Sequence, residues 1–222
     1  MDGNGRWAKK KLLPRLVGHK KGLESVRKII EYCIKYNVKT LTIYAFSTEN
    51  WKRPIKEVEG LLKLFSESIS KESKKIHSNN IKLKFIGDTS LLTKALQIKI
   101  KEIEKETSRN KRLVLNVALN YGGRLDIVNS VNTFYNNKKK IKKITEKDIN
   151  SGLYTKGQSD VDLLIRTGGQ QRMSNFLLWQ SAYAELFFSK KLWPDFDEKI
   201  FVNALYFFQN TERKFGSVSK SK

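Results

Sequence analysis

Leu41-Thr-Ile-Tyr-Ala-Phe46, followed at once by Ser47-Thr-Glu-Asn50, is the stretch that decides the predicted fold. The run is short, apolar and rich in β-branched and aromatic residues, as a buried strand is, and the residues after it are polar. Further strand signals occur at 81–86, 113–119, 163–165 and 187–188. Apolar residues at helical spacing fill 20–36, 55–79, 90–108, 124–138 and 198–214. This alternation predicts an α/β protein, a single domain with a mostly parallel central sheet flanked by helices.

Polar or glycine-rich residues follow the predicted strands. They are 47–50, 87–88, 120–123 and 166–169. In an open parallel sheet, ligands bind outside the carboxyl ends of the strands. All of these stretches except 87–88 carry groups suited to phosphate, so we expect a phosphate-handling site at this edge of the sheet.

The chain opens with Met1-Asp-Gly-Asn-Gly-Arg-Trp7. Two glycines around an asparagine allow backbone N–H groups to point to one centre, which suits an anion. Arg6 adds a planar fork for phosphate oxygens, and Asp2 adds an oxygen ligand for magnesium. The run therefore predicts a site for a metal-bound diphosphate, and the alternative is an ordinary Gly-Asn turn.

The composition is that of a folded protein with a strongly basic surface. With 222 residues, 39% of them hydrophobic, the chain can form one domain with a core. The formal net charge is +22, which would attract nucleic acid, anionic lipid or a polyphosphate. The lysines are spread through every segment, as in 136–143, rather than gathered with aromatic residues. Nucleic-acid binding is therefore not predicted.

Cys33 is the single cysteine, so an internal disulfide is excluded. It lies in an apolar helical stretch, which predicts a buried thiol and fits a reducing compartment. No apolar run approaches the roughly 18–20 residues that span a bilayer, and no signal peptide or amphipathic anchor is evident. We therefore expect a cytoplasmic protein whose contact with a membrane, if any, is peripheral.

Several unusual strings in one order carry a resemblance to a known family. They are Met1–Trp7, Ala45-Phe-Ser-Thr-Glu-Asn-Trp-Lys-Arg-Pro54, Asn120-Tyr-Gly-Gly-Arg124, Asp162-Leu-Leu-Ile-Arg-Thr-Gly-Gly169, the run from Arg172 to Glu185, and Leu192-Trp-Pro-Asp-Phe196. From Met1 to Gly216 the chain resembles the cis-prenyltransferases. The paired Asp-Asp-x-x-Asp motifs of the trans-type helical prenyltransferases are absent from the sequence.

The resemblance implies a reaction. Farnesyl diphosphate loses pyrophosphate, isopentenyl diphosphate attacks the allylic carbon, and one proton leaves to give a cis double bond. Repeated condensation would give undecaprenyl diphosphate, the carrier-lipid precursor for cell-wall polysaccharide, with Mg²⁺ as cofactor. A homodimer and transient membrane contact through the lipid product are also implied.

The resemblance also implies roles for individual residues. Asp2 and Asn50 would be catalytic, and Asn50 would orient a water or a phosphate oxygen that accepts the proton. The metal would be held by Asp2 and Glu185. The substrate-binding positions are Gly3, Asn4, Gly5, Arg6, Trp7, Arg15, His19, Ser47, Thr48, Glu49, Trp51 and Arg53 for the allylic substrate, and Arg166, Arg172, Met173 and Ser174 for isopentenyl diphosphate.

The product chain would run in an apolar channel. By resemblance, residues of the helix after Pro54 and of the 113–119 strand line it: Val58, Leu61, Leu62, Phe65, Leu113 and Leu115. The alternative is that these residues are ordinary core.

Departures from the family pattern are also visible. Gln170 stands where glutamate is usual, and Lys214-Phe-Gly216 stands where arginine usually begins that motif, which predicts weaker substrate binding. An apolar strand usually precedes the opening motif, so either the start lies upstream of Met1 or the sheet lacks its first strand. We expect the domain to span 1–216, with 217–222 as a disordered basic tail.

Two other functions stay open within the same fold: a cis-prenyltransferase of different product length, or a non-catalytic partner subunit. Retention of the acidic, arginine and amide positions favours an enzyme.

Overall fold

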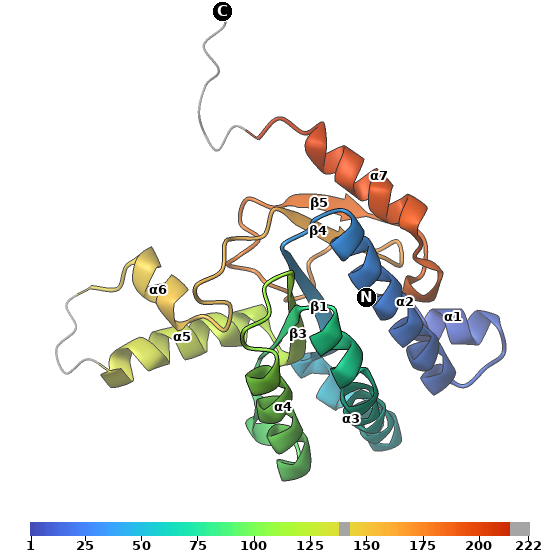
Figure 1. The fold of residues 1–222 in the computed structure, drawn as a ribbon, viewed down its shortest axis with the longest axis horizontal. Helices are drawn as coiled ribbons and strands as arrows, with labels where there is room; N and C mark the ends of the chain where they lie inside the picture. The colour runs from blue at the N-terminus through green and yellow to red at the C-terminus, as the bar shows by residue number, and fades with distance from the viewer. Residues whose placement is uncertain (138–142, 214–222) are drawn as a thin grey trace, which may run out of the picture.

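The computed structural model describes residues 1–137 and 143–213 (Figure 1). Its strands are β1 (Thr40–Ser47), β2 (Ile81–Ile86), β3 (Leu113–Tyr121), β4 (Leu163–Arg166) and β5 (Glu185–Phe188). Its helices are α1 (Asn4–Lys10), α2 (Arg15–Lys35), α3 (Ile55–Ser78), α4 (Lys94–Glu106), α5 (Gly123–Asn137), α6 (Glu146–Gly152) and α7 (Glu198–Gln209). Short 3₁₀ turns occupy Thr48–Lys52, Thr89–Leu91 and Trp193–Asp195.

Every strand pair in the described residues is parallel, which confirms the predicted sheet type. β3 lies between β1 and β2, with Thr40 opposite Val114. β4 and β5 pair separately, with Leu163 opposite Glu185. The central sheet thus has two hydrogen-bonded parts. Residues 1–3 join neither part as a strand.

The core lies between the three-stranded part of the sheet and the helices α2, α3 and α4. β3 is the central strand and is buried along almost its whole length, which explains its nearly continuous apolar sequence. α4 presents Leu96, Ile100 and Ile103 to the core, at helical spacing. On the other part of the sheet α7 lies along β5, where the rings of Phe187 and Phe207 are 5.7 Å apart (Figure 1).

The predicted elements agree with the structure, with differences at their ends. The strands at 41–46, 81–86, 113–119 and 163–165 are confirmed, and the edge strand at 187–188 begins at Glu185. The helix predicted at 90–108 begins at Lys94, because Asp88 caps the separate 3₁₀ turn at Thr89–Leu91 and Thr93 caps α4 itself. α1 and α6 were not predicted, since each has only seven residues. The motif at 214–216 and the tail at 217–222 lie outside the described residues.

Across the two described ranges, no helix combines the length and the apolar character needed to cross a membrane.

Candidate active site

The backbone of Asp2 is fixed against the residue that follows β4. Its N–H donates to Thr167 Oγ1 at 3.0 Å, and its carbonyl accepts from the same hydroxyl at 2.8 Å. The Trp193 N–H also donates to that carbonyl, at 2.9 Å. The opening motif is therefore placed at the carboxyl end of β4, where the sequence predicted a ligand site.

The Asp2 carboxylate lies between two guanidinium groups. Oδ1 is 3.1 Å from Arg6 Nη2, and Oδ2 is 3.1 Å from Arg166 Nη2. Burial by itself would raise the pKa of Asp2, but the hydrogen bonds and charges of Arg166 and Arg6 outweigh it and hold the pKa below its usual value. Asp2 is therefore ionised at neutral pH and available as an oxygen ligand.

Arg166 is the centre of this cluster. Its Nη1 donates to Ser174 Oγ at 2.6 Å and to the Arg172 carbonyl oxygen. Arg6 Nη1 donates to the Gly168 carbonyl at 2.7 Å. Gly168 has φ +88°, and a Cβ there would collide with the Arg6 guanidinium. The glycine therefore allows the two arginines to approach one carboxylate.

A second charged cluster surrounds Glu57 on α3. Its Oε2 lies 3.1 Å from Arg15 Nε, and its Oε1 lies 3.2 Å from Arg53 Nη1 and 3.7 Å from His19 Nε2. Burial, and next the Arg53 guanidinium, lowers the pKa of His19 to about 4. His19 is therefore neutral at pH 7 and can offer a proton to an anion only through a neutral N–H.

The loop after β1 brings the third group of predicted residues to the same edge. Ser47 N–H donates to Asn50 Oδ1 at 3.2 Å, and together they form a capping box. Asn175 Nδ2 donates to Glu49 Oε1 at 2.8 Å. Because Asn175 follows Ser174 directly, this contact joins the loop to the Arg166 cluster.

Close backbone contacts join the clusters. A Cβ at Gly5 would lie 2.9 Å from Arg15 Cζ, so the glycine admits that guanidinium beside α1. A Cβ at Gly122 would lie 2.8 Å from Thr48 Oγ1. Trp51 Nε1 donates to Asn120 Oδ1 at 2.8 Å, across the ends of β1 and β3. The predicted positions on α1, α2, the β1 loop and the β4 loop thus surround one region.

Four further predicted residues make contacts of their own in the structure. Asn4 packs into the α1–α2 contact, where its side chain faces Gly22. Trp7 Nε1 donates to Asp195 Oδ1 at 2.8 Å. Met173 accepts at its carbonyl from the Phe176 N–H. Glu185 opens β5, three residues before the end paired with Arg166, and its Oε1 is 3.9 Å from Arg213 Nε.

Sequence reasoning missed Glu57, Thr167 and Asn175. Each holds a predicted residue in place, and none belongs to a position that the resemblance assigned. For Glu57 a signal existed, because Arg53 and Glu57 are four residues apart across a helix start. The contacts of Thr167 and Asn175 join positions more than 120 residues apart and depend on the fold.

A cavity of about 180 Å³ opens beside the charged region. Met1 lines it, directly before Asp2, and Ala45 lines it near the end of β1. Most other lining residues are apolar side chains of α2, α3 and the sheet: Leu23, Val26, Ile30, Ile34, Ile43, Phe65, Ile69, Ile76, Ile81, Leu83, Phe85, Leu115 and Val117. Polar side chains of α2 and α3, together with Asn79, complete the lining: Arg27, Glu31, Ser68, Glu72 and Lys75. Of the predicted channel residues, Phe65 and Leu115 line this cavity. Val58, Leu61, Leu62 and Leu113 pack in the core.

In the part of the chain that the structure describes, no three His, Cys, Asp or Glu side chains gather as a metal cage. Mg²⁺ does not need one, because it often binds one or two carboxylates, several waters and substrate phosphates. The ionised and half-exposed Asp2 carboxylate, beside arginines that suit phosphate, fits such a site.

Solved structures share this fold. Lavandulyl diphosphate synthase from Lavandula x intermedia, solved with dimethylallyl diphosphate, matches with a TM-score of 0.92 and 32% identity, over 97% of this chain and 95% of that one. A protein from Campylobacter jejuni described as a "probable undecaprenyl diphosphate synthase" matches with a TM-score of 0.81 and 35% identity, over 89% and 92%. The fold is that of a cis-prenyltransferase.

The sequence comparisons are more specific. Residues 1–216 match the family model described as "Putative undecaprenyl diphosphate synthase". The ditrans,polycis-undecaprenyl-diphosphate synthase ((2E,6E)-farnesyl-diphosphate specific) of Pasteurella multocida is 49% identical, over 99% of this chain and 93% of its own length. The chain belongs to the undecaprenyl diphosphate synthase family.

Proposed function

We propose that this protein condenses isopentenyl diphosphate units onto farnesyl diphosphate with cis geometry and releases undecaprenyl diphosphate. One observation carries the proposal: Asp2 joins two arginines, and the residue before it lines an apolar cavity. Such a site can hold a diphosphate at its charged end and an isoprenoid chain at its apolar end. The specificity stated in the name of the relative that is 49% identical supports the choice of substrates.

The charged groups suit two diphosphates. Arg166 Nη1 lies 2.6 Å from Ser174 Oγ, so both groups are already together. They would bind isopentenyl diphosphate, with Arg172 adding a second guanidinium. Arg15, His19 and Arg53 surround Glu57 and would bind the allylic diphosphate with the glycines of the opening motif. Negative charge develops on the departing pyrophosphate, and fixed guanidinium and N–H groups stabilise it in the transition state.

Asp2 would hold Mg²⁺, which neutralises charge on the departing diphosphate when bound. Glu185 remains a candidate second acid from β5, although in this chain its carboxylate lies toward Arg213. The proton lost from isopentenyl diphosphate would leave near Asn50. Asn50 is a neutral amide held by the Ser47 N–H, so it would position the acceptor rather than act as the base.

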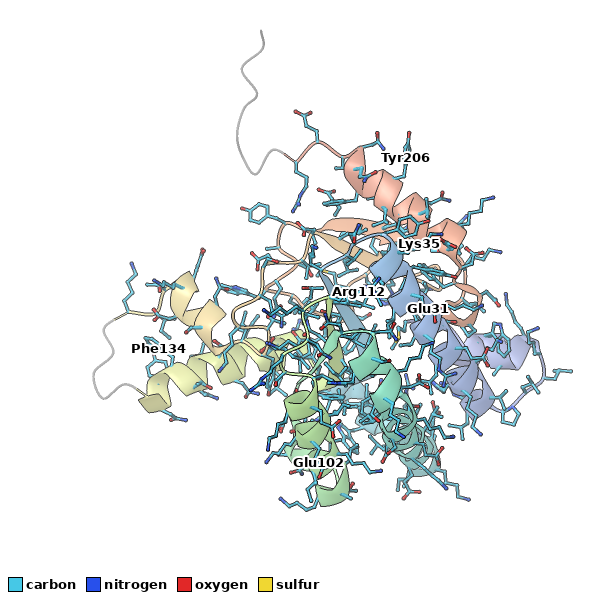
Figure 2. The ribbon with its side chains drawn as sticks, viewed as in Figure 1. Glu31, Lys35, Glu102, Arg112, Phe134 and Tyr206 are labelled. Carbon is cyan, nitrogen blue, oxygen red and sulfur yellow. The ribbon has the colours of Figure 1, made fainter. Side chains whose placement is uncertain are left out.

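A homodimer is part of the proposal. The edge strand β5, the residues just before it and the neighbouring helix α7 expose large apolar side chains, namely Tyr183, Leu186, Tyr206 and Phe207. Tyr206, which is 67% exposed, lies on the outer side of α7 (Figure 2). A second copy would cover this face. The buried Cys33 thiol, whose pKa burial raises to about 12, suits a reducing cytoplasm, and the lipid product implies transient contact with the membrane.

The test is incubation of the purified chain with farnesyl diphosphate, radiolabelled isopentenyl diphosphate and Mg²⁺, with and without chelator. Formation of undecaprenyl diphosphate with Mg²⁺, and its loss when chelator is present, would support the proposal. A single product of another length would keep the reaction but change the product assignment, which is the second candidate function. Absence of any product with correctly folded dimer would favour a non-catalytic partner subunit.

A further inference from the structure

The turn between α1 and α2 exposes two leucines. Leu12 is 96% exposed and Leu13 is 40% exposed. Leu12 also has φ +58°, a left-handed conformation that glycine or asparagine usually occupies at a helix end. Figure 1 shows this turn at the edge of the molecule, at the end opposite α5 and α6. An exposed leucine in this conformation gains no packing and strains the backbone, so folding alone does not explain it.

The apolar surface continues onto the neighbouring helix starts. Leu16 and Val17, in the first turn of α2, are 36% and 37% exposed, and Ile55, the first residue of α3, is 76% exposed. The ion pair of Arg15 with Glu57 holds these two helix starts together. We call Leu12, Leu13, Leu16, Val17 and Ile55 the leucine patch.

Lysines border this patch. Lys10, Lys11, Lys190 and Lys191 line a hollow of about 300 Å³, together with Trp7, Leu192 and Asp195. Asp195 is the single acid in this lining, and its carboxylate accepts the Trp7 indole N–H. Lys11 Nζ lies 5.0 Å from the centroid of the Trp7 ring and directly precedes Leu12. This lysine hollow is therefore positively charged and continuous with the leucine patch along the chain.

We propose that the leucine patch and the lysine hollow together dock on a lipid bilayer that contains anionic lipid. A projecting apolar turn can enter the boundary between headgroups and acyl chains, and the lysines beside it can contact lipid phosphates. Lysine near an anionic surface strengthens binding by roughly fivefold. A leucine removed from water strengthens it by about tenfold or more. Neither the apolar patch nor the lysines would hold the protein at a membrane alone. Because they are adjacent, they can act together and bind the membrane reversibly.

The test is flotation of the full chain with vesicles of phosphatidylcholine, with or without phosphatidylglycerol, in the absence of prenyl substrates. Because no turnover is measured, this result and the test of the proposed function can fail independently. Leu12→Asn removes the exposed leucine while asparagine tolerates the left-handed conformation, so the fold is kept. We expect it to lower partition onto anionic vesicles about tenfold. Lys10→Gln with Lys11→Gln should lower this partition about 25-fold.

Matched controls lie on α4, where Ile98 is 56% exposed. Ile98→Gln, and Lys101→Gln with Lys105→Gln, should bind vesicles as the unchanged protein does. Failure of the unchanged protein to bind anionic vesicles would overturn the proposal. An equal loss in the α4 variants would also overturn it, because the general charge of +22 would then explain binding. A smaller mass of Leu12→Asn in vesicle-free solution would assign the patch to a contact between copies instead.

Discussion

The charged cluster around Asp2 and the apolar cavity beside it are organised in opposite ways. In the cluster, each charged group already has a partner: Asp2 contacts Arg6 and Arg166, and Arg166 contacts Ser174. The cavity is an apolar space between α2, α3 and the sheet. The charged cluster is therefore preorganised for diphosphate groups. The apolar cavity limits only the length of isoprenoid chain that fits.

The volume of the apolar cavity is small compared with the proposed product. A cavity of roughly 150 Å³ accepts a benzene-sized molecule, so the observed space of about 180 Å³ holds little more than one isoprene unit. For the proposed product to fit, the cavity has to widen severalfold, while the diphosphate groups keep their places.

The wall between α2 and α3 can open at small cost. Arg27 Nη2 lies 2.7 Å from Glu72 Oε1, and Lys75 Nζ lies 3.0 Å from Glu31 Oε1. These four residues line the cavity at its solvent side, with Glu31 on the outer face of α2 (Figure 2). Exposed ion pairs of this kind contribute about 0–1 kcal/mol each, so their loss would not oppose widening strongly.

The largest expected effect follows from removing Asp2. Asp2→Ala should lower turnover about a thousandfold, because a carboxylate that would hold Mg²⁺ supplies several kcal/mol of transition-state stabilisation. Steady-state kinetics with varied Mg²⁺ would measure it. Asp2→Asn keeps the size of the side chain and should lose as much turnover as Asp2→Ala. The thermal midpoint of unfolding of both variants should stay near that of the unchanged protein. Near-normal turnover in either variant would contradict the role of Asp2.

A smaller effect is expected for Arg166→Lys. Lysine keeps the charge but cannot reach Asp2, Ser174 and the Arg172 carbonyl together. Loss of one charge-assisted hydrogen bond, about 1.5–3 kcal/mol, should raise KM for isopentenyl diphosphate about 10- to 100-fold. Arg112→Lys, at an exposed arginine far from the cluster, should leave KM unchanged. Equal values for both variants would exclude Arg166 from substrate binding.

The charged region should also show a pH dependence of stability that involves His19. Burial lowers its pKa from 6.5 to about 4, so between these values the unfolded state binds a proton that the folded state does not. Stability therefore falls as pH falls, by about 2 kcal/mol between pH 7 and pH 5. Urea unfolding of the unchanged protein and His19→Gln would measure the difference. His77→Gln, at the exposed histidine, should keep the full pH dependence of stability. Loss of that dependence in His77→Gln would contradict its assignment to His19.

Substitution of a residue that lines the cavity should have the smallest effect on the reaction rate. It should, however, change the length of the product. Val117→Phe adds volume to a buried lining residue. The first condensation should keep its rate, while the product becomes shorter and stability falls by about 1–3 kcal/mol through overpacking. Product chromatography would detect this change. Val128→Phe, at a 53% exposed position on α5, is the control. A product of unchanged length would show that this cavity does not receive the chain.

Much of the fold was predictable because its signals are local. The strands at β1, β2, β3 and β4 are short apolar runs with turn residues after them, and they occur within two residues of the predicted ends. The seven-residue helices α1 and α6 were missed because one or two turns give too few positions to show a period. Their stability comes from tertiary contacts, as in the packing of Asn4 against Gly22 on α2.

The candidate site was predictable in its members but less so in its geometry. Asp2 was expected at the metal, Arg6 at the allylic diphosphate and Arg166 at isopentenyl diphosphate, and in the structure the Asp2 carboxylate contacts both guanidinium groups. Glu185 was expected with Asp2 at the metal, and its own contact in this chain is with Arg213. The two positions lie near opposite ends of the β4–β5 pair. A motif assigns a residue to a reaction, whereas its side-chain direction depends on strand register and on neighbours.

The sequence by itself determined the α/β class, the polar ends of the strands and the residue types that suit a diphosphate. These follow from short-range patterns, which depend on neighbours a few positions apart. Only the tertiary structure decided that Glu57 gathers Arg15, His19 and Arg53, and that the cavity adjoins Asp2. It also decided that Leu12 stays exposed while other leucines form the core. Burial and long-range contact are properties of the packed chain, so residue order alone leaves them open.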